Sequence, residues 1–227
     1  YNGIVPKVVA KVGEKVKAGS VLMIDKNRPE IKFVSPVSGE VTAVNRGEKR
    51  KVLSVVVKPE AQIEYEDFGK KNVASLKREE VKEAILHAGM WPFIKQRPYD
   101  IVASPADEPR DIFVSAFYSA PLAPNFDFVV KGQEVDFQTG LDALAKLTDG
   151  KVYVGIRKGS SVSVKGVETV EVEGPHPAAN VGVQINHIKP INKGEVVWTV
   201  NPADVIVIGR LFNKGIADFS RLVVITG

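Results

Sequence analysis

The chain has 227 residues, of which 44% are hydrophobic and 26% are charged, a composition typical of a globular protein of one or two domains. It contains no cysteine, which excludes disulfides, thiolate-held iron–sulfur clusters and cysteine nucleophiles, and no apolar run reaches the length that spans a bilayer. The net charge is only +4 and the three histidines are not spaced as ligand pairs, so neither a nucleic-acid partner nor a metal site is expected.

Residues 1–58 consist of short valine-rich runs separated by turns. The turns are built on glycines, which reach a positive φ without strain: Gly13, Gly19, Gly39 and Gly47. Two similar units, Val-Gly-Glu-Lys at 12–15 and Asn-Arg-Gly-Glu-Lys at 45–49, lie on either side of Pro36. This pseudo-repeat predicts a small flattened β-barrel made of two interlocked halves, and it resembles the biotinyl/lipoyl carrier family.

A carrier domain attaches its cofactor to a lysine at the tip of its central hairpin. Here the tip falls near Asn27, Arg28 and Pro29, whereas Lys26 lies short of it. We therefore expect no attached cofactor and interpret the barrel as a structural or docking module. The basic clusters at 46–51 and 70–78 are most simply solvated surface.

The second part of the chain follows a polar connector at 59–74, and its apolar spacing becomes helical. Ser75 is the expected cap of a first helix that ends at Gly89. A second amphipathic helix ends at Gly150. Their apolar faces comprise Val81, Ala84, Ile85 and Ala88 in the first and Phe137, Leu141, Leu144 and Leu147 in the second.

A third helix is predicted at 202–213, because Asn201 can cap it, Pro202 suits its first position and Asp204 lies in its first turn. The expected strands are 111–117, 152–156, 167–173, 196–200 and 221–226. Because strands and helices alternate, residues 75–227 are predicted to form a Rossmann-like α/β domain with a largely parallel sheet.

Three stretches of this domain are candidates for chemistry. Arg-Lys-Gly-Ser-Ser at 157–161 follows a strand and could bind an anion, but it lacks the glycine spacing of a Walker loop, so a plain turn is favoured. Gly-Pro-His-Pro-Ala at 174–178 holds His176 between prolines with no serine or carboxylate partner in its own loop, which favours a structural histidine. Gly-Met-Trp-Pro-Phe-Ile-Lys-Gln-Arg-Pro-Tyr at 89–99 gathers aromatic and basic residues.

Taken together, several segments resemble the NqrA family, whose members are subunits of the Na+-translocating NADH:quinone oxidoreductases. The segments are 89–99, 174–178, Lys-Phe-Val-Ser-Pro-Val-Ser-Gly-Glu-Val at 32–41 with Asn-Arg-Gly-Glu-Lys-Arg at 45–50, and Asp-Val-Ile-Val-Ile-Gly-Arg-Leu-Phe at 204–212. The resemblance covers essentially the whole chain, which would be about half of such a protein. It also implies relation to the flavin- and NADH-binding subunit of respiratory complex I and to the RnfC component of the Rnf complex.

The resemblance implies a peripheral accessory subunit on the cytoplasmic face of the bacterial inner membrane, bound to the other subunits of the complex. That complex oxidises NADH, reduces quinone and exports Na+, so the chain would belong to an enzyme while being non-catalytic itself. NAD, quinone, flavins and iron–sulfur would belong to the whole complex, and no cofactor would reside in this chain.

Where the related flavin-binding subunits cradle a phosphate on a glycine-rich loop, this chain has 89–99. Trp91 and Phe93 are bulky and Pro92 lacks a donor, which predicts that neither flavin mononucleotide nor NADH binds. A quinone headgroup would suit an aromatic pocket, with Trp91, Phe93, Arg97 and His176 as candidates. The alternatives are that Trp91 and Phe93 merely fill the vacated cleft, or that the domain is a flavin mononucleotide- and NADH-binding diaphorase.

Overall fold

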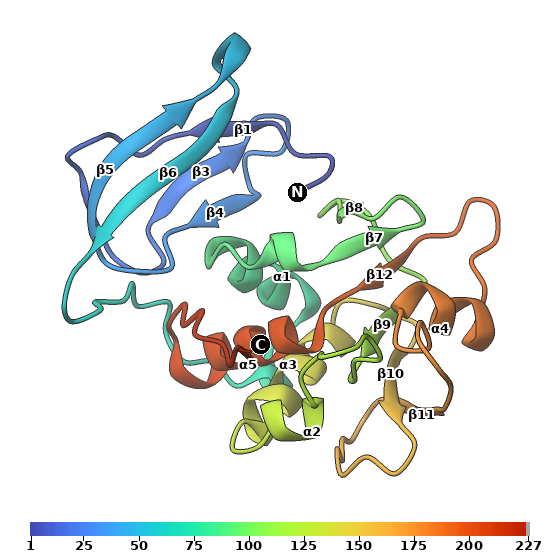
Figure 1. Ribbon diagram of the computed structural model, residues 1–227. Coiled ribbons are helices and arrows are strands. Elements are labelled where there is room, and N and C mark those ends of the chain that lie inside the picture. The colour runs from blue at the N-terminus through green and yellow to red at the C-terminus, as the bar shows by residue number, and fades with distance from the viewer. Residues whose placement is uncertain (226–227) are drawn as a thin grey trace.

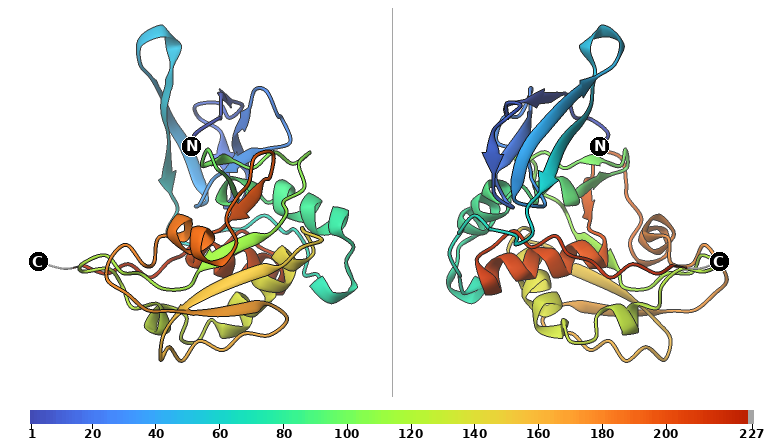
Figure 2. Two further views of the ribbon diagram at one scale, coloured as in Figure 1. Left: turned by 90° about the vertical axis from the view of Figure 1, so that its right-hand side faces the viewer. Right: turned by 60° about the vertical axis from the view of Figure 1, so that its left-hand side comes forward.

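The computed structural model describes residues 1–225. Figure 1 shows an all-β part, built from the first sixty residues, resting on an α/β part that the rest of the chain forms. Two further views show that the long β5–β6 hairpin projects away from the α/β part (Figure 2). The predicted fold class, a barrel-sandwich β domain followed by an α/β domain, is confirmed.

The all-β part consists of two small sheets that enclose a core of aliphatic side chains. One sheet has the order β1-β3-β4 and the other the order β2-β5-β6, and every neighbouring pair is antiparallel. Ala10, Val16, Leu22 and Val41 fill the space between the sheets. The strands are β1 Pro6–Val8, β2 Lys15–Val16, β3 Val21–Asp25, β4 Lys32–Val34, β5 Gly39–Arg46 and β6 Val52–Pro59.

The tip of the β3–β4 hairpin, residues 26–31, points at the α/β part. Arg28 donates hydrogen bonds to the carbonyls of Val102 at 3.3 Å and Gly3 at 3.1 Å, and its Nε donates to Asp25 at 3.0 Å. Ile31, at the other end of the tip, is fully buried in the core of the α/β part. The predicted position of the tip is thus confirmed, and the tip is in contact with the second part of the chain.

The α/β part is built on one six-stranded sheet with the order β11-β10-β9-β12-β7-β8. The four strands from β11 to β12 are parallel to their neighbours, whereas β7 and β8 are antiparallel. The predicted largely parallel sheet is therefore confirmed. Its strands are β7 Lys95–Arg97, β8 Ile101–Val102, β9 Ile112–Ser115, β10 Val152–Arg157, β11 Glu168–Val172 and β12 Val197–Thr199.

Helices cover both faces of this sheet, and alternation along β9 separates the two cores. Ile112 and Val114 pack in the larger core with α3 and α5, whereas Phe113 packs with Ile185 of α4 on the opposite face. The helices are α1 Arg78–His87, α2 Phe126–Val129, α3 Glu134–Ala145, α4 Val181–Ile188 and α5 Pro202–Lys214, with short 3-10 turns η1 Glu48–Arg50, η2 Val73–Ser75 and η3 Trp91–Phe93.

Two expectations about the elements are corrected. Ser75 ends the turn η2, and α1 begins at Arg78 after Lys77, whose backbone N–H donates to Glu80 at 2.8 Å. Residues 221–225 are not a strand. Arg221 pairs with Asp204 and lies over the Phe93 ring, which holds this segment beside α5. Residue 226 of the predicted strand lies outside the described residues.

Candidate functional site

One pocket lies at the switch point of the six-stranded sheet, between β9 and β12, where the strand order reverses, and it is called the switch-point pocket below. The chain leaves β9 toward β10 on one side, whereas β12 lies on the other side of β9, and β9 and β12 are parallel. A crevice opens at the carboxyl ends of two such strands, and α/β proteins bind their ligands there. The pocket has a volume of about 360 Å³ and lies between the ends of β9 and β12 and the first turns of α4 and α5.

The wall of this switch-point pocket combines aromatic rings with a few polar groups. Phe93, Phe117 and Tyr118 contribute the rings. Lys95 and Arg97 reach it from β7, which is the antiparallel neighbour of β12. The combination of ring faces and convergent donors is typical of sites for flat ligands that carry carbonyl groups.

Burial disfavours the charged forms of two groups in this pocket. It lowers the pKa of the Lys95 amine, although Asp100 and Asp204 act in the opposite direction. It raises the pKa of Asp204, against the opposing effect of Arg221. The Arg97 Nε is buried and, in the described part of the chain, donates no hydrogen bond, while it lies 3.4 Å from Asp100 Oδ1. The pocket therefore disfavours added charge but retains a donor.

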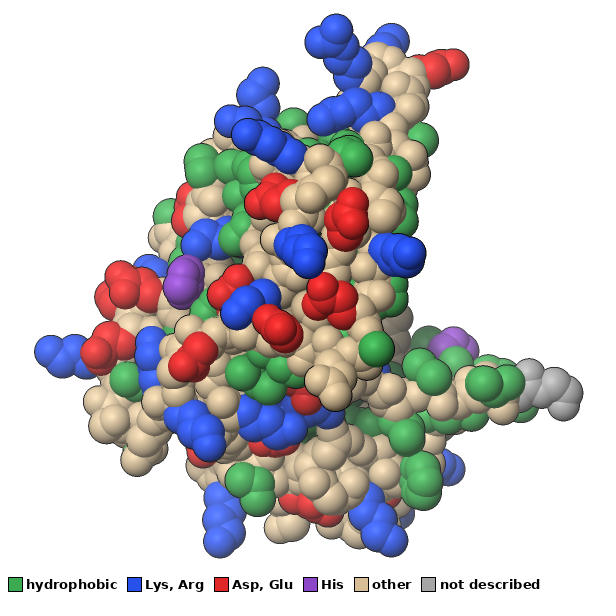
Figure 3. Space-filling view, turned by 90° about the vertical axis from the view of Figure 1, so that its left-hand side faces the viewer, with side chains coloured by type: hydrophobic (Ala, Val, Ile, Leu, Met, Phe, Trp, Pro, Cys, Tyr) green, Lys and Arg blue, Asp and Glu red, His purple; other side chains and the backbone are tan. Residues whose placement is uncertain are grey.

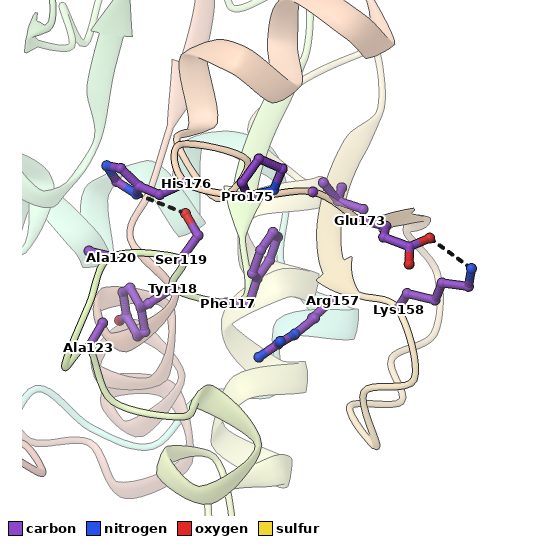
Figure 4. A pocket seen from close by; sticks show the side chains of 12 residues that line it. Phe117, Tyr118, Ser119, Ala120, Ala123, Arg157, Lys158, Glu173, Pro175 and His176 are labelled. Atoms are coloured by element: carbon purple, nitrogen blue, oxygen red, sulfur yellow. Dashed lines mark hydrogen bonds and ion pairs between the residues drawn. The ribbon is translucent and has the colours of Figure 1, made fainter.

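A second hollow of about 600 Å³ adjoins the first, because Phe117 and Tyr118 line both. Figure 4 shows it between the loop that follows β9 and the loop that holds His176. The Ser119 hydroxyl lies 3.1 Å from His176 Nδ1 and also accepts the backbone N–H of Ala179 at 3.1 Å. The partner that His176 lacks within its own loop is thus supplied by a loop distant in sequence.

The loop at 157–161 uses its polar groups internally. The Ser161 N–H donates to Asp127 Oδ1 at 2.6 Å, and the hydroxyls of Ser160 and Ser161 donate to the same oxygen at 2.6 and 2.9 Å. Although burial opposes it, these hydrogen bonds lower the pKa of Asp127. A carboxylate of the chain itself therefore occupies the place where a bound anion would accept these bonds.

Three of the four residues predicted from the sequence border the adjoining hollows, and one does not. Phe93 and Arg97 line the switch-point pocket, and His176 lines the second hollow. Trp91 lies in η3 and is fully buried. Its indole N–H donates to the Ala103 carbonyl at 2.8 Å, and its ring packs edge-to-face on Trp198 with 5.4 Å between centroids.

Residues 89–94 do not fit a phosphate cradle, which needs free backbone N–H groups. The N–H groups of Gly89, Met90, Phe93 and Ile94 donate to backbone carbonyls of the chain at 2.9 to 3.1 Å. Pro92 has no N–H group, and Trp91 fills the space beneath the turn. A flavin phosphate would therefore find four of the N–H groups of this segment already engaged.

Several pocket residues were not predicted as site residues: Lys95, Ser115, Tyr118, Asn201 and Asp204. Lys95 belongs to the 89–99 stretch, whereas Asn201 and Asp204 were interpreted only as capping residues of a helix. The available signal was positional, since Ser115 ends β9 and Asn201 follows β12. Within residues 1–225, no three acidic or histidine side chains are arranged to hold a metal ion. The helices of that region are all too short or too polar for a membrane crossing.

The fold and the pocket define a protein in which a barrel-sandwich domain precedes an α/β domain with a switch-point pocket. Comparison with known families gives the same two parts. Residues 1–60 match the NqrA N-terminal barrel-sandwich hybrid domain, and residues 76–217 match the NqrA second alpha/beta domain. The chain therefore belongs to the NqrA family.

Curated relatives match along the whole chain. Their names identify them as the NqrA component of Na(+)-translocating NADH-quinone reductase, and examples from Neisseria meningitidis and Hahella chejuensis are each 38% identical over 232 aligned positions. The protein of that name from Yersinia pseudotuberculosis is 36% identical. Each alignment covers 100% of this chain and 52% of the relative, so the chain spans about half the length of these proteins.

Proposed function

We propose that the chain is part of the NqrA component of a bacterial Na+-translocating NADH–quinone reductase and serves there as a peripheral, non-catalytic element on the cytoplasmic face of the membrane. The observation that carries the proposal is the 38% identity to proteins of that name along 100% of the chain. The enzyme would oxidise NADH, reduce quinone and export Na+ as a complex, with NAD, flavins and iron–sulfur held elsewhere. The partners of this chain would be the other subunits.

The proposed domains of the chain are residues 1–58 and residues 75–227, joined by a connector at 59–74.

Co-purification tests the proposed membership of the complex. An affinity-tagged version of the chain is expressed in a bacterium that contains the enzyme but lacks its own NqrA. The other subunits should be retained on the resin from detergent-solubilised membranes. Recovery of the tagged chain alone, with no other component of the reductase, would contradict the proposal.

A role in quinone binding is the second part of the proposal, and the switch-point pocket supports it. The headgroup of a quinone is flat and neutral, which suits a pocket where burial disfavours the charged forms of Lys95 and Asp204. Phe93 and Phe117 offer ring faces, and the guanidinium of Arg97 could donate to a quinone carbonyl. Trp91 would support the pocket from below without touching the ligand, and His176 would lie in the adjoining hollow.

Isothermal titration of the chain with a short-chain quinone analogue tests this role. Arg97→Gln removes the guanidinium, and we expect it to weaken binding about tenfold, as the loss of one hydrogen bond to a charged donor does. Arg157→Gln is the matched control, because Arg157 lines the second hollow and not the switch-point pocket. Equal effects of both variants, or the absence of any binding heat, would remove the quinone site from this pocket.

The same preparation separates this role from the flavin-binding alternative. A diaphorase domain would carry visible flavin absorbance after purification, or would acquire it when flavin mononucleotide is added. We expect a colourless protein with no affinity for flavin mononucleotide or NADH, because the N–H groups of Gly89, Met90, Phe93 and Ile94 are already engaged. Stoichiometric flavin in the purified chain would replace the accessory role with the diaphorase role.

A further inference from the structure

The β5–β6 hairpin carries the most concentrated charge of the all-β part at its projecting end. The hairpin patch consists of four basic side chains and one leucine: Arg46, Lys49, Arg50, Lys51 and Leu53. Glu48 is the only acidic residue between positions 46 and 53. Figure 3 shows Lys and Arg side chains gathered at this end of the molecule, and no residue of the hairpin lines the switch-point pocket.

The charges of the hairpin patch are not neutralised within the chain. All four basic side chains are exposed, and in the region that the structure describes, none of them forms an ion pair, unlike Lys151 and Lys158, which pair with Glu168 and Glu173. The guanidinium of Arg46 donates to the carbonyl of Arg50 at 3.3 Å, which holds it within the turn. The patch is therefore available to an anionic surface.

The turn presents these side chains outward and brings a leucine beside them. The Lys51 N–H donates to the Glu48 carbonyl at 3.1 Å, and Lys49 and Arg50 both adopt positive φ, at 52° and 60°, as a type I′ hairpin turn requires. Leu53 is 63% exposed, and a Cβ at Gly47 would lie 3.3 Å from its Cδ1. An apolar side chain is thus exposed next to the unpaired cations.

We propose that the hairpin patch binds anionic phospholipid headgroups and so places the barrel-sandwich domain on the membrane surface. Basic side chains near an anionic leaflet gain affinity from the surface potential, and a neighbouring apolar side chain can enter the headgroup region. This lipid contact would add to the proposed role in a membrane complex, and it depends on that role only because the complex would bring the chain to a membrane. Residues 46–53 contain no aromatic side chain, which disfavours single-stranded nucleic acid as the occupant.

Vesicle co-sedimentation with the full chain tests this site directly and needs no other subunit. Vesicles of phosphatidylcholine alone are compared with vesicles that contain about a third phosphatidylglycerol, at low salt and at 0.5 M salt. We expect binding to the phosphatidylglycerol vesicles only, and we expect salt to abolish it, since the Debye length falls well below about 10 Å. Failure of co-purification with the complex would leave this binding unchanged, so the two proposals fail separately.

The turn geometry offers a variant that removes charge without disturbing the fold. Lys49→Asn with Arg50→Gly introduces the Asn-Gly pair that a type I′ turn prefers, so its thermal midpoint should be equal to or above that of the parent. Its partitioning onto phosphatidylglycerol vesicles should fall about twenty-five-fold, at about fivefold for each of the two cations. Lys70→Asn with Lys71→Asn is the matched control, because it removes the same charge from the other basic cluster.

The outcomes divide as follows. Loss of binding in the hairpin variant alone supports the proposal, and a further loss with Leu53→Ser supports contact with the headgroup region. Equal loss in both charge variants reduces the effect to overall charge and overturns the proposal. Absence of vesicle binding also overturns the proposal. If, in addition, the hairpin variant fails to join the membrane complex, the patch is assigned to an acidic protein surface.

Discussion

At the scale of single residues, Asp111 is the buried charge on which the start of the parallel sheet depends. Its side chain is fully buried, accepts the Lys151 N–H at 3.1 Å and the Arg110 Nε at 2.7 Å, and lies 2.7 Å from the Lys189 amine. It therefore ties the first residues of β9 and β10 to the segment after α4. Burial alone would raise its pKa, but the bonds from Lys189, Lys151 and Arg110 outweigh burial and lower it.

This arrangement predicts both a loss of stability and a change in pH dependence for Asp111→Asn. We expect the free energy of unfolding at pH 7 to fall by about 2 kcal/mol, between the values for buried and exposed ion pairs, because Lys189 is partly exposed. A carboxyl whose pKa is lowered by folding stabilises the protein above its unfolded pKa, and this contribution is lost as pH falls through the folded value. Urea unfolding between pH 7 and 3 measures both effects.

The variant should therefore lose less stability than the parent protein as pH falls below about 4, since it has no carboxyl at this position to protonate. Lys158→Ala serves as a control, because Lys158 pairs with Glu173 on the surface and should change stability by less than about 1 kcal/mol. Parallel pH profiles for the parent and Asp111→Asn would show that the carboxylate is not stabilising in the folded state.

At the scale of elements, α3 and α5 pack with their backbones in contact, and two glycines allow it. A Cβ at Gly209 would lie 1.7 Å from the Asp136 carbonyl, and a Cβ at Gly140 would lie 2.1 Å from the Val205 carbonyl. Neither distance can be relieved by moving a side chain, because the opposing atoms are backbone. The crossing of the two helices is therefore fixed by the absence of side chains at these positions.

Gly209→Ala is predicted to destabilise the protein by about 3 kcal/mol, because the methyl group overlaps backbone that cannot yield without separating the helices. Helix propensity alone predicts the opposite sign, a gain of about 1 kcal/mol for alanine in a helix interior. Thermal or urea unfolding gives the sign directly. Gly140→Ala should repeat the effect from the other helix, and a stabilising result for either variant would contradict the backbone contact.

Capping chemistry made α5 predictable, whereas pairing between distant segments was not. The Ala203 N–H donates to Asn201 Oδ1 at 3.0 Å and Gly215 ends the helix with φ of 73°, so the run Val205–Ile208 is helical despite its strand-like composition. The similar run Leu222–Ile225 was predicted as a strand and is not one, because Arg221 is drawn to Asp204. Whether such a run becomes a strand depends on contacts between side chains distant in sequence, which the local sequence pattern does not reveal.

The position of the candidate pocket could be predicted from the sequence only in part. Phe117 and His176 follow β9 and β11, and Arg157 is the last residue of β10; a parallel sheet brings such positions to one edge. The direction of Trp91 depends on the turn η3, whose Met90 and Ile94 neighbours are both buried. A sequence read as one aromatic stretch thus separates into a core residue, Trp91, and a pocket residue, Phe93.

At the scale of the whole molecule, the two parts are joined by both the hairpin tip and the connector. The connector forms backbone hydrogen bonds with Ala18 of the barrel, with Phe212 of α5 and with Gly215 just after that helix, at 2.8 to 3.0 Å. The tip adds the Arg28 hydrogen bonds and the buried side chain of Ile31. The surface that a carrier domain leaves free for its swinging arm is here part of an internal interface.

Ile31→Ala is therefore predicted to loosen the joint between the two parts. The variant should lose about 3 kcal/mol, since truncation of a buried isoleucine costs its transfer free energy and leaves a cavity. We expect calorimetry to show two unfolding transitions where the parent shows one, because the cavity removes the main apolar contact that the tip makes with the α/β core. Lys26→Ala changes an exposed residue of the same hairpin and should leave the single transition unaltered. A single transition at the parent midpoint in Ile31→Ala would mean that the Ile31 side chain does not hold the two parts together.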